Sequence, residues 1–325
     1  MNRLLRLSLF GTSALAILGV PLFTVPASPL ALSLGDESAT LTFVGDIMLD
    51  RYILKKARPQ TGAGHGFENI AVGFNEVFNK SDLILGNLEG PVTTTPSLSE
   101  HTYIGDQNNM RFTFSPESLA FLTANNISFV SIGNNHITDF GPDGVRQTKH
   151  HLTQADIQFI GDPYDKPRAA TTTINGVSIA FIAYNQFTGQ SGAETVSAIE
   201  RAGETTDHTV VLAHWGEEYQ STPTVFQRDL ARRFVDAGAT LVVGTHPHVV
   251  QTTETYGEGL ILYSLGNFVF DQYWHPAVRC GLVATVTLDR ETLLGTSTTT
   301  ARSQKNGTTI HKACNPLAEL PVTTP

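Results

Sequence analysis

The chain has 325 residues, of which 41% are hydrophobic, 16% charged and 9% aromatic. This composition is typical of one large folded domain and argues against a disordered or fibrous protein. The formal net charge of −9 argues against nucleic acid as a partner, because too few Lys and Arg residues are present to meet its phosphates.

The first residues have the pattern of an export signal. Arg3 and Arg6 precede an apolar run at about 7–25, and small residues at 27–31 offer cleavage sites. The run is close to the minimum length for a membrane span. We therefore assign residues 1–34 to a signal peptide or an N-terminal membrane anchor. We expect the remainder to be exported, as an extracytoplasmic domain that is secreted or anchored to the membrane by this segment.

Short apolar runs follow, and each of them ends in polar residues or glycine. Runs rich in Val, Ile, Leu and Phe suit strands that are covered on both faces. Amphipathic stretches lie between them, so the alternation predicts an α/β fold. The runs are LTFVG (41–45), DLILG (82–86), FVSIG (129–133), VSIAFIAY (177–184), TVVLA (209–213), TLVVG (240–244) and LILYSLG (260–266).

Proline marks the start of three predicted helices, which begin near Pro116, Pro142 and Pro223. Proline suits the first helical position because the N–H that it lacks has no partner there. The polar and irregular segment 91–110 is predicted to be a long loop or hairpin beside the functional site.

Residues 35–295 form the predicted principal domain. The chain then becomes rich in Thr, Ser and Gly, so we assign residues 296–325 to a polar C-terminal hairpin or tail. The two cysteines, Cys280 and Cys314, do not belong to a CxxC pair, so zinc-ribbon and thioredoxin motifs have no support. In an exported chain they can join in one disulfide, and two buried thiols are the alternative.

A candidate metal ligand follows almost every apolar run. The segments are GD (45–46), GNLE (86–89), GNNH (133–136), AHWGEE (213–218) and GTHPH (244–248). The functional crevice of an α/β sheet lies beyond the carboxyl ends of its strands, where such loops converge. Oxygen and imidazole ligands together suit Mn, Fe, Zn or Mg. We therefore predict one pocket, whose candidate residues are Asp46, Glu89, Asn135, His136, His214, His246 and His248.

Each of these residues also has an ordinary structural alternative. Asp46 suits a helix cap or a turn, and Glu89 a solvated loop. Asn134 and Asn135 suit a left-handed turn, with His136 capping the next element. The GTHPH segment is the strongest single signal, because two histidines one residue apart in an extended loop can reach two adjacent metals or two faces of one.

Six longer motifs share their order with a known family. They are TFVGDIML (42–49), SDLILGNLEGPV (81–92), SIGNNHITDFGPDG (131–144), VVLAHWGEEY (210–219), VVGTHPHVVQ (242–251) and YSLGNFVFDQ (263–272). The chain thereby resembles the CapA family of poly-γ-glutamate capsule biosynthesis proteins, whose domain is related to calcineurin-like metallophosphoesterases. The resemblance implies an α/β fold of the metallophosphoesterase-like layered sandwich type, with central mixed β-sheets flanked by helices.

The resemblance also implies a role for each candidate residue. It makes Asp46 and His248 ligands of one metal, Asn135, His214 and His246 ligands of a second, and Glu89 the bridge between them. His136 then resembles the general acid that stabilises the leaving group. Asn87, Asn134, Asn267 and Glu218 are candidates for supporting the ligands, and Glu218 is expected to orient His214.

Two departures from the related catalytic enzymes affect the first metal. The usual Asp-x-His opening is replaced by Asp46, Ile47 and Met48, so an imidazole is lost. Glu89 stands where an Asp would bridge. A thioether is a poor ligand for a hard cation, so the resemblance leaves one or two divalent ions as the expected cofactor.

The implied function is participation in the synthesis or export of a capsule or poly-γ-glutamate. The expected partners are membrane-associated capsule polymer synthesis proteins, and the expected substrate is an anionic polymer or a phosphoester. The net charge would repel an anionic polymer unless a metal or the group Arg228, Arg232 and Arg233 offsets it, and a solvated helix face is the simpler interpretation of these arginines. The alternatives are a free-standing metal-dependent phosphoesterase or other hydrolase, and a non-catalytic scaffold that retains the fold.

Overall fold

The computed structural model describes residues 37–58, 64, 66–103, 105–165 and 169–315. The predicted signal peptide or anchor, residues 1–34, lies outside these residues. Within the part of the chain that the structure describes, no helix combines the length and the apolar character needed to cross a membrane.

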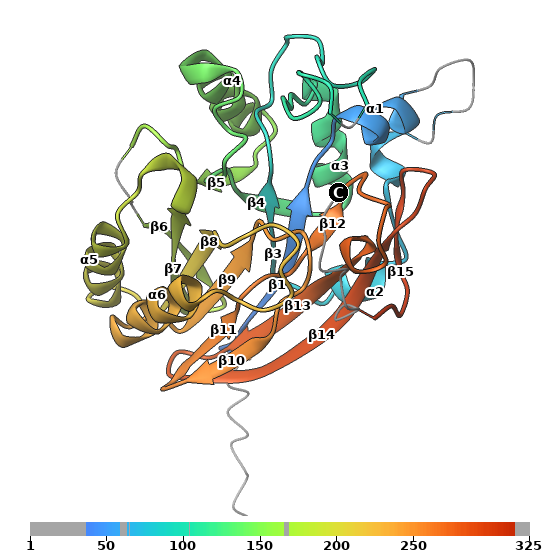
Figure 1. Cartoon of the computed structure of the whole chain (residues 1–325). Coiled ribbons are helices and arrows are strands. Elements are labelled where there is room, and N and C mark those ends of the chain that lie inside the picture. The colour runs from blue at the N-terminus through green and yellow to red at the C-terminus, as the bar shows by residue number, and fades with distance from the viewer. Residues whose placement is uncertain (1–36, 59–63, 65, 104, 166–168, 316–325) are drawn as a thin grey trace, which may run out of the picture. The chain divides into compact units, whose positions relative to one another are not determined.

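Two β-sheets form the centre of the fold (Figure 1). The strands of the nine-stranded sheet are β1 (Ala39–Ile47), β2 (Ala71–Val72), β3 (Leu83–Leu88), β4 (Ile127–Ser131), β5 (Gln158–Ile160), β12 (Asn267–Val269), β13 (Cys280–Leu288), β14 (Leu293–Ser303) and β15 (Thr309–His311). The strands of the six-stranded sheet are β6 (Ala170–Ile174), β7 (Val177–Asn185), β8 (His208–His214), β9 (Leu241–Thr245), β10 (Thr253–Tyr256) and β11 (Gly259–Leu262).

Both sheets are mixed. The first runs in the order β2-β15-β14-β13-β1-β3-β4-β5, and β12 pairs with the end of β1. The second runs β10-β11-β9-β8-β7-β6. Strands β1, β3, β4 and β5 are parallel to one another, as are β7, β8, β9 and β11. In the first sheet the parallel strands form one half, from β1 to the β5 edge, and in the second they lie between the antiparallel margins formed by β10 and β6.

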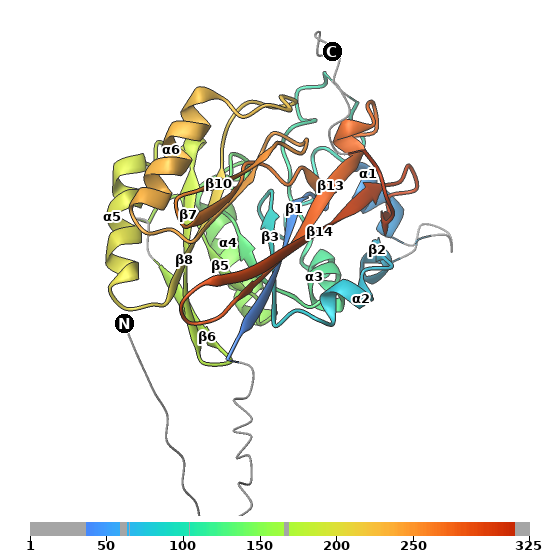
Figure 2. The same ribbon diagram turned by 90° about the horizontal axis from the view of Figure 1, so that it is seen from below.

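Helices cover the outer faces of the two sheets. They are α1 (Arg51–Ala57), α2 (Asn75–Phe78), α3 (Ala120–Ala124), α4 (Gly141–Gln154), α5 (Gly192–Gly203) and α6 (Val225–Asp236), with short 3₁₀ turns η1 (Phe67–Asn69), η2 (Pro116–Leu119), η3 (Gln186–Thr188) and η4 (Ala277–Arg279). Figures 1 and 2 show α5 and α6 together on one side and α2 and α3 on the other. The order of layers is helices, sheet, sheet, helices.

Strand alternation explains why the cores separate in this way. Successive side chains of a strand point to opposite faces. In β7, Ile179 and Phe181 therefore belong to the core between the sheets, and Ala180 and Ile182 belong to the core shared with α5 and α6. A further core joins the first sheet to the other helices. These layers confirm the predicted α/β sandwich of mixed sheets flanked by helices.

The apolar runs and the proline signals both correspond to elements of the structure. Each of the seven runs overlaps a strand, and Pro142 lies in the first turn of α4. The helix expected after Pro223 begins slightly later, at Val225. Thr224 caps it, because its hydroxyl accepts from the Gln227 backbone N–H and the Gln227 side chain accepts from the Thr224 N–H.

The sheet continues beyond residue 295. Strand β14 crosses that position and pairs with β13 along its length, and its last residues pair with β15. A disulfide joins Cys280, the first residue of β13, to Cys314, which follows β15. The disulfide closes a loop that contains β13, β14 and β15, and it links the residues after β15 to the start of β13.

Replacing both cysteines by serine (Cys280→Ser with Cys314→Ser) should lower the free energy of unfolding by about 2–4 kcal/mol, because the unfolded chain then loses a loop constraint. The two cysteines are 34 residues apart. Thermal and denaturant unfolding of the two proteins measures the effect, and reduced wild-type protein serves as the control because it should behave like the variant. Equal stability of the variant and the oxidised wild type would contradict the prediction.

Candidate metal centre

The candidate ligands lie at the carboxyl ends of parallel strands from both sheets. Asp46 lies near the end of β1, Glu89 directly follows β3, and His214 is the last residue of β8. Gly45 makes this arrangement possible, because a Cβ at that position would overlap the carbonyl oxygen of Gly266. The backbone of β1 therefore lies close to the segment before β12 at the residue that precedes Asp46.

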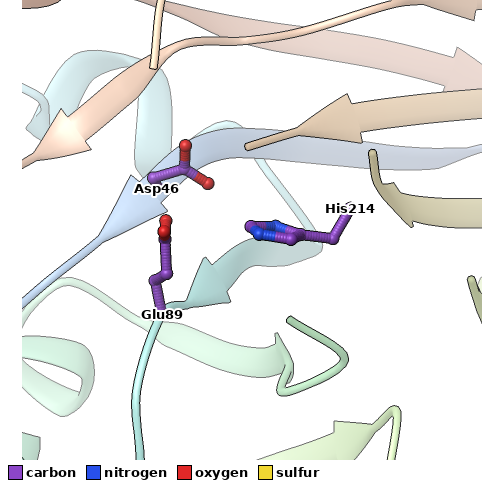
Figure 3. Close-up of side chains that lie close together, drawn as sticks. All are labelled: Asp46, Glu89 and His214. Atoms are coloured by element: carbon purple, nitrogen blue, oxygen red, sulfur yellow. The ribbon is translucent and has the colours of Figure 1, made fainter. Parts of the chain in front are cut away.

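Asp46, Glu89 and His214 form the centre of the site (Figure 3). One ligand atom from each lies within 4.8 Å of the others, and all three residues are buried. Figure 3 shows the two carboxylates and the imidazole pointing toward a common point from β1, from the loop after β3 and from β8. Two oxygens and one nitrogen at this spacing can hold a divalent metal ion.

Asn87 holds these three side chains in place. Its Nδ2 donates to Asp46 Oδ1 at 2.8 Å, and it lies 3.5 Å from Glu89 Oε2 and 3.3 Å from His214 Nδ1. Asn134 fixes the orientation of the Asn87 side-chain amide. Its Nδ2 donates to Asn87 Oδ1 at 3.1 Å and to the Leu88 carbonyl at 2.8 Å. Asn87 therefore contacts all three candidate ligands directly, and Asn134 contacts them through Asn87.

The surroundings of His214 differ from the expectation at one point. Asn135 Oδ1 lies 2.9 Å from His214 Nε2, so the two predicted ligands are adjacent. At Nδ1 the partner is the hydroxyl of Thr245, at 3.0 Å, and not the carboxylate of Glu218 that we expected. The register of β8 and β9 places Thr245 directly beside His214, whereas half-buried Glu218 acts on Glu89 through its charge.

His246 and His248 complete the pocket from the loop after β9. Both have positive φ, 98° and 59°, a conformation that is strained for residues with a Cβ and that the surrounding contacts must hold. The His246 N–H donates to Asp46 Oδ2 at 3.3 Å, and His248 Nδ1 lies 3.2 Å from the same oxygen. His248 Nδ1 also lies 2.9 Å from Asn267 Oδ1, which orients the ring as a supporting residue does.

Burial raises the pKa of the carboxyl group of Glu89 in this pocket and lowers the pKa of two of its histidines. Burial, followed by the charge of Asp46, raises the pKa of Glu89 well above its usual value. Burial also lowers the pKa of His214 well below its usual value, and together with the charge of His248 it lowers the pKa of His246 to about 3. Neutral imidazoles are the form that binds metals.

Two buried atoms indicate that the pocket fits a cation. Glu89 Oε1 and His246 Nδ1 are both buried and, among the described residues, have no hydrogen-bond partner. An unpaired carboxylate oxygen beside a second carboxylate is unfavourable in a low dielectric unless a positive charge compensates it. The donor set therefore matches a divalent metal ion.

His136 lies at the side of this pocket and forms a pair with Asp139. His136 Nδ1 is 2.9 Å from Asp139 Oδ2, which also accepts from the Phe112 N–H at 2.8 Å. The Phe112 ring lies 4.2 Å from the imidazole. Sequence reasoning missed Asp139, although it lies three residues after His136 in the HITD segment.

Arg51 was also missed by sequence reasoning. Its guanidinium pairs with Asp271 and lies over the rings of Phe112 and Phe270, at 4.9 and 5.6 Å. This charge favours ionised Glu89. Met48, in contrast, is buried in the core and its sulfur accepts from the Asp50 N–H at 3.1 Å.

Comparison with known proteins gives consistent matches. A family model described as bacterial capsule synthesis protein PGA_cap matches residues 40–272. The PGA biosynthesis protein CapA of Bacillus subtilis (strain 168) is 32% identical over 265 residues, which is 76% of this chain and 67% of that protein. The capsule biosynthesis protein CapA of Bacillus anthracis is 31% identical over 272 residues, 76% of this chain and 64% of that protein.

A probable polyglutamine synthesis accessory protein of Mycobacterium tuberculosis (strain H37Rv) is 27% identical over 222 residues, 59% of this chain and 56% of that protein. The chain thus spans between about half and two thirds of the length of these relatives. The family match contains all of the strand-end loops that build the pocket. The chain belongs to the bacterial capsule synthesis protein PGA_cap family.

Proposed function

We propose that this protein is an extracytoplasmic accessory protein of capsule or poly-γ-glutamate synthesis or export, and that it acts through a divalent metal pocket. The observation that carries the proposal is the coincidence of the family match, residues 40–272, with a buried Asp46, Glu89 and His214 cluster. The Cys280–Cys314 disulfide supports export, because disulfides persist mainly in oxidising compartments. The proposed partners are membrane-associated polymer synthesis proteins, and the proposed substrate is an anionic polymer or a phosphoester.

The residues proposed to hold the metal fall into two adjacent groups. Asp46, Glu89 and His248 form one group, and Asn135, His214 and His246 form the other, with Glu89 placed to serve both. One or two divalent ions, such as Mn, Fe, Zn or Mg, suit this mixture of oxygen and imidazole donors. A divalent cation bound there supplies Lewis-acid polarisation of a phosphoryl or carbonyl oxygen.

The protein's own side chains supply proton transfer and orientation. We propose that His136 is the general acid. With Nδ1 held by Asp139, the proton that His136 gives to a leaving group is carried on Nε2. Asn267 and Thr245 fix the rings of His248 and His214 in the same way.

The His136 and Asp139 pair favours a second candidate function, a free-standing metal-dependent phosphoesterase or related hydrolase. A protein that bound a metal only for structure would have no need for an oriented proton donor beside it. The position of Met48 favours the third reading, a scaffold without turnover, because the thioether lies in the core and adds no ligand to the pocket.

The capsule role and the pocket can be tested together with one variant, His246→Ala with His248→Ala. Purified wild-type protein should contain one or two divalent ions per chain by elemental analysis, and the variant should contain none. In Bacillus subtilis that lacks its own CapA, the wild-type chain should restore extracellular polymer and the variant should not. Restoration by a metal-free variant would show that the pocket is not needed, and a metal-free wild type would refute the metal centre.

A Glu89→Gln substitution should separate metal binding from stability. Because the folded state raises the pKa of Glu89, its contribution to stability is complete below its unfolded value and is lost as the pH rises toward the raised value. In chelator, the variant should therefore melt at a higher temperature than wild type at pH 8, with a smaller difference near pH 4. Added Mn²⁺ should stabilise only the wild type. A variant that is less stable at pH 8 and still responds to Mn²⁺ would contradict this assignment.

Substituting His136 by Ala should lower the turnover of a phosphoester such as p-nitrophenyl phosphate by about 10²–10⁴-fold, the usual contribution of a positioned general acid. The metal content should stay unchanged, and Asp139→Asn should give a smaller loss. If His136→Ala also removed the metal, His136 would be a ligand and not the proton donor.

A further inference from the structure

Asn185 is a polar residue at a strand end that the proposed function does not use. It directly follows the apolar run 177–184 and is the last residue of β7. In the parallel pairing of β7 with β8, Asn185 lies opposite His214. Paired residues of parallel strands project to the same face of a sheet, so Asn185 projects into the same crevice as His214.

Neighbouring contacts place this strand end against the pocket. Gly133, at the start of the loop that carries Asn135 and His136, packs on Ala183, because a Cβ added at Gly133 would lie 3.4 Å from the Ala183 Cβ. Two residues after Asn185, the ring of Phe187 lies 4.3 Å from His246 and 5.8 Å from His214. Segment 185–187 is therefore part of the wall of the metal centre.

The orientation of the Asn185 amide is fixed by its own turn. The Phe187 N–H donates to Asn185 Oδ1 at 3.0 Å, and only the oxygen of an amide can accept. The Asn185 N–H in turn donates to Gln190 Oε1 at 2.8 Å, which holds the backbone. The carbonyl oxygen is thus occupied, and the side chain presents its NH₂ group to the remaining space.

This NH₂ group is a buried donor without a partner. Asn185 is 2% exposed, and within the described part of the chain Nδ2 makes no hydrogen bond. A buried donor normally has an acceptor. The group cannot bind a metal, because an amide NH₂ has no lone pair for a cation. An acceptor that arrives with a ligand would supply the missing partner.

We infer that Asn185 is a substrate-binding residue whose Nδ2 donates to an oxyanion, a phosphate or a carboxylate group, held at the metal centre. The inference rests on the proposed function, since a cation in the pocket is what draws an anionic group beside Asn185. The neutral donor binds one oxygen of the anion, while Phe187 covers the same edge of the site. Both candidate substrates, an anionic polymer and a phosphoester, carry such an oxygen.

The test compares Asn185→Ala and Asn185→Asp with wild type in binding orthophosphate and L-glutamate. Asn185→Asp keeps the volume and the acceptor for the Phe187 N–H but replaces the donor by a negative charge. Asn125→Asp is the matched control, because Asn125 is 8% exposed and its Nδ2 is already bonded to the Phe121 carbonyl at 2.8 Å. Calorimetric titrations of Mn²⁺-loaded and chelated proteins, with metal content and melting temperature measured for each, give the readout.

For the loaded proteins we expect about tenfold weaker anion binding in Asn185→Ala and a larger loss in Asn185→Asp. Metal content should stay the same, and the Asn125→Asp protein should bind as wild type does. A loss confined to orthophosphate would identify a phosphate ligand, and one confined to L-glutamate a carboxylate. Affinities within twofold of wild type, loss of metal in Asn185→Ala, or no binding of either anion to wild type would overturn the inference.

Titrations of the chelated proteins distinguish a failure of the Asn185 inference from a failure of the proposed metal pocket. If wild type held no metal, the metal pocket would be refuted, and a tenfold loss in chelated Asn185→Ala would still support Asn185 as an anion donor. Equal binding by the chelated wild type and Asn185→Ala proteins would then overturn the role of Asn185 as well.

Discussion

The close approach of two buried carboxylates, Asp46 and Glu89, is the constraint on which the rest of the site depends. Like charges in a low dielectric repel strongly, and burial together with the charge of Asp46 raises the pKa of Glu89. Burial keeps His214 and His246 neutral, so these rings do not supply the missing positive charge. His248 lies beside both carboxylates, with Nδ1 3.2 Å from Asp46 Oδ2 and Nε2 3.7 Å from Glu89 Oε1, and the Arg51 guanidinium is already paired with Asp271. A cation held between the two carboxylates would offset their repulsion, which is the physical basis for proposing a metal.

The two-sheet architecture explains how a single chain brings these groups together. Asp46 and Glu89 belong to the first sheet, and His214, His246 and His248 belong to the second. The parallel strands of both sheets end at the same crevice. Each strand end can therefore contribute a candidate ligand through a short loop. Glycine at Gly45 lets β1 approach Gly266 closely, and the strained backbone of His246 is held by its bond to Asp46. The contacts that stabilise the fold here are therefore also the contacts that fix the geometry of the site.

The strands and the ligand positions could be predicted from sequence because both are local signals. An apolar run that ends in a small residue before polar ones shows where a parallel strand ends, and this located the candidate ligands Asp46, Glu89 and His214. Residues set by strand register or by long-range pairing could not be located in this way. Thr245 replaces Glu218 beside His214 because of the register of β8 and β9, and the Arg51 pair with Asp271 joins residues 220 positions apart. Asn185 did follow an apolar run, but its importance depends on an unpaired atom that only the structure reveals.

The charge of the protein makes the pocket decisive for any anionic substrate. A net charge of −9 repels a polyanion, and two of the three arginines on α6 already have partners. Arg232 pairs with Glu254, and Arg228 donates to the Pro223 carbonyl within its own chain segment. Because the net charge opposes a polyanion at long range, binding of an anion would depend mainly on short-range contacts inside the crevice. A cation between Asp46, Glu89 and the histidines, with the neutral donor of Asn185 beside it, would supply such contacts to one phosphate or carboxylate group. Recognition would then select a single anionic group of the substrate and would depend little on the length of the polymer that carries it.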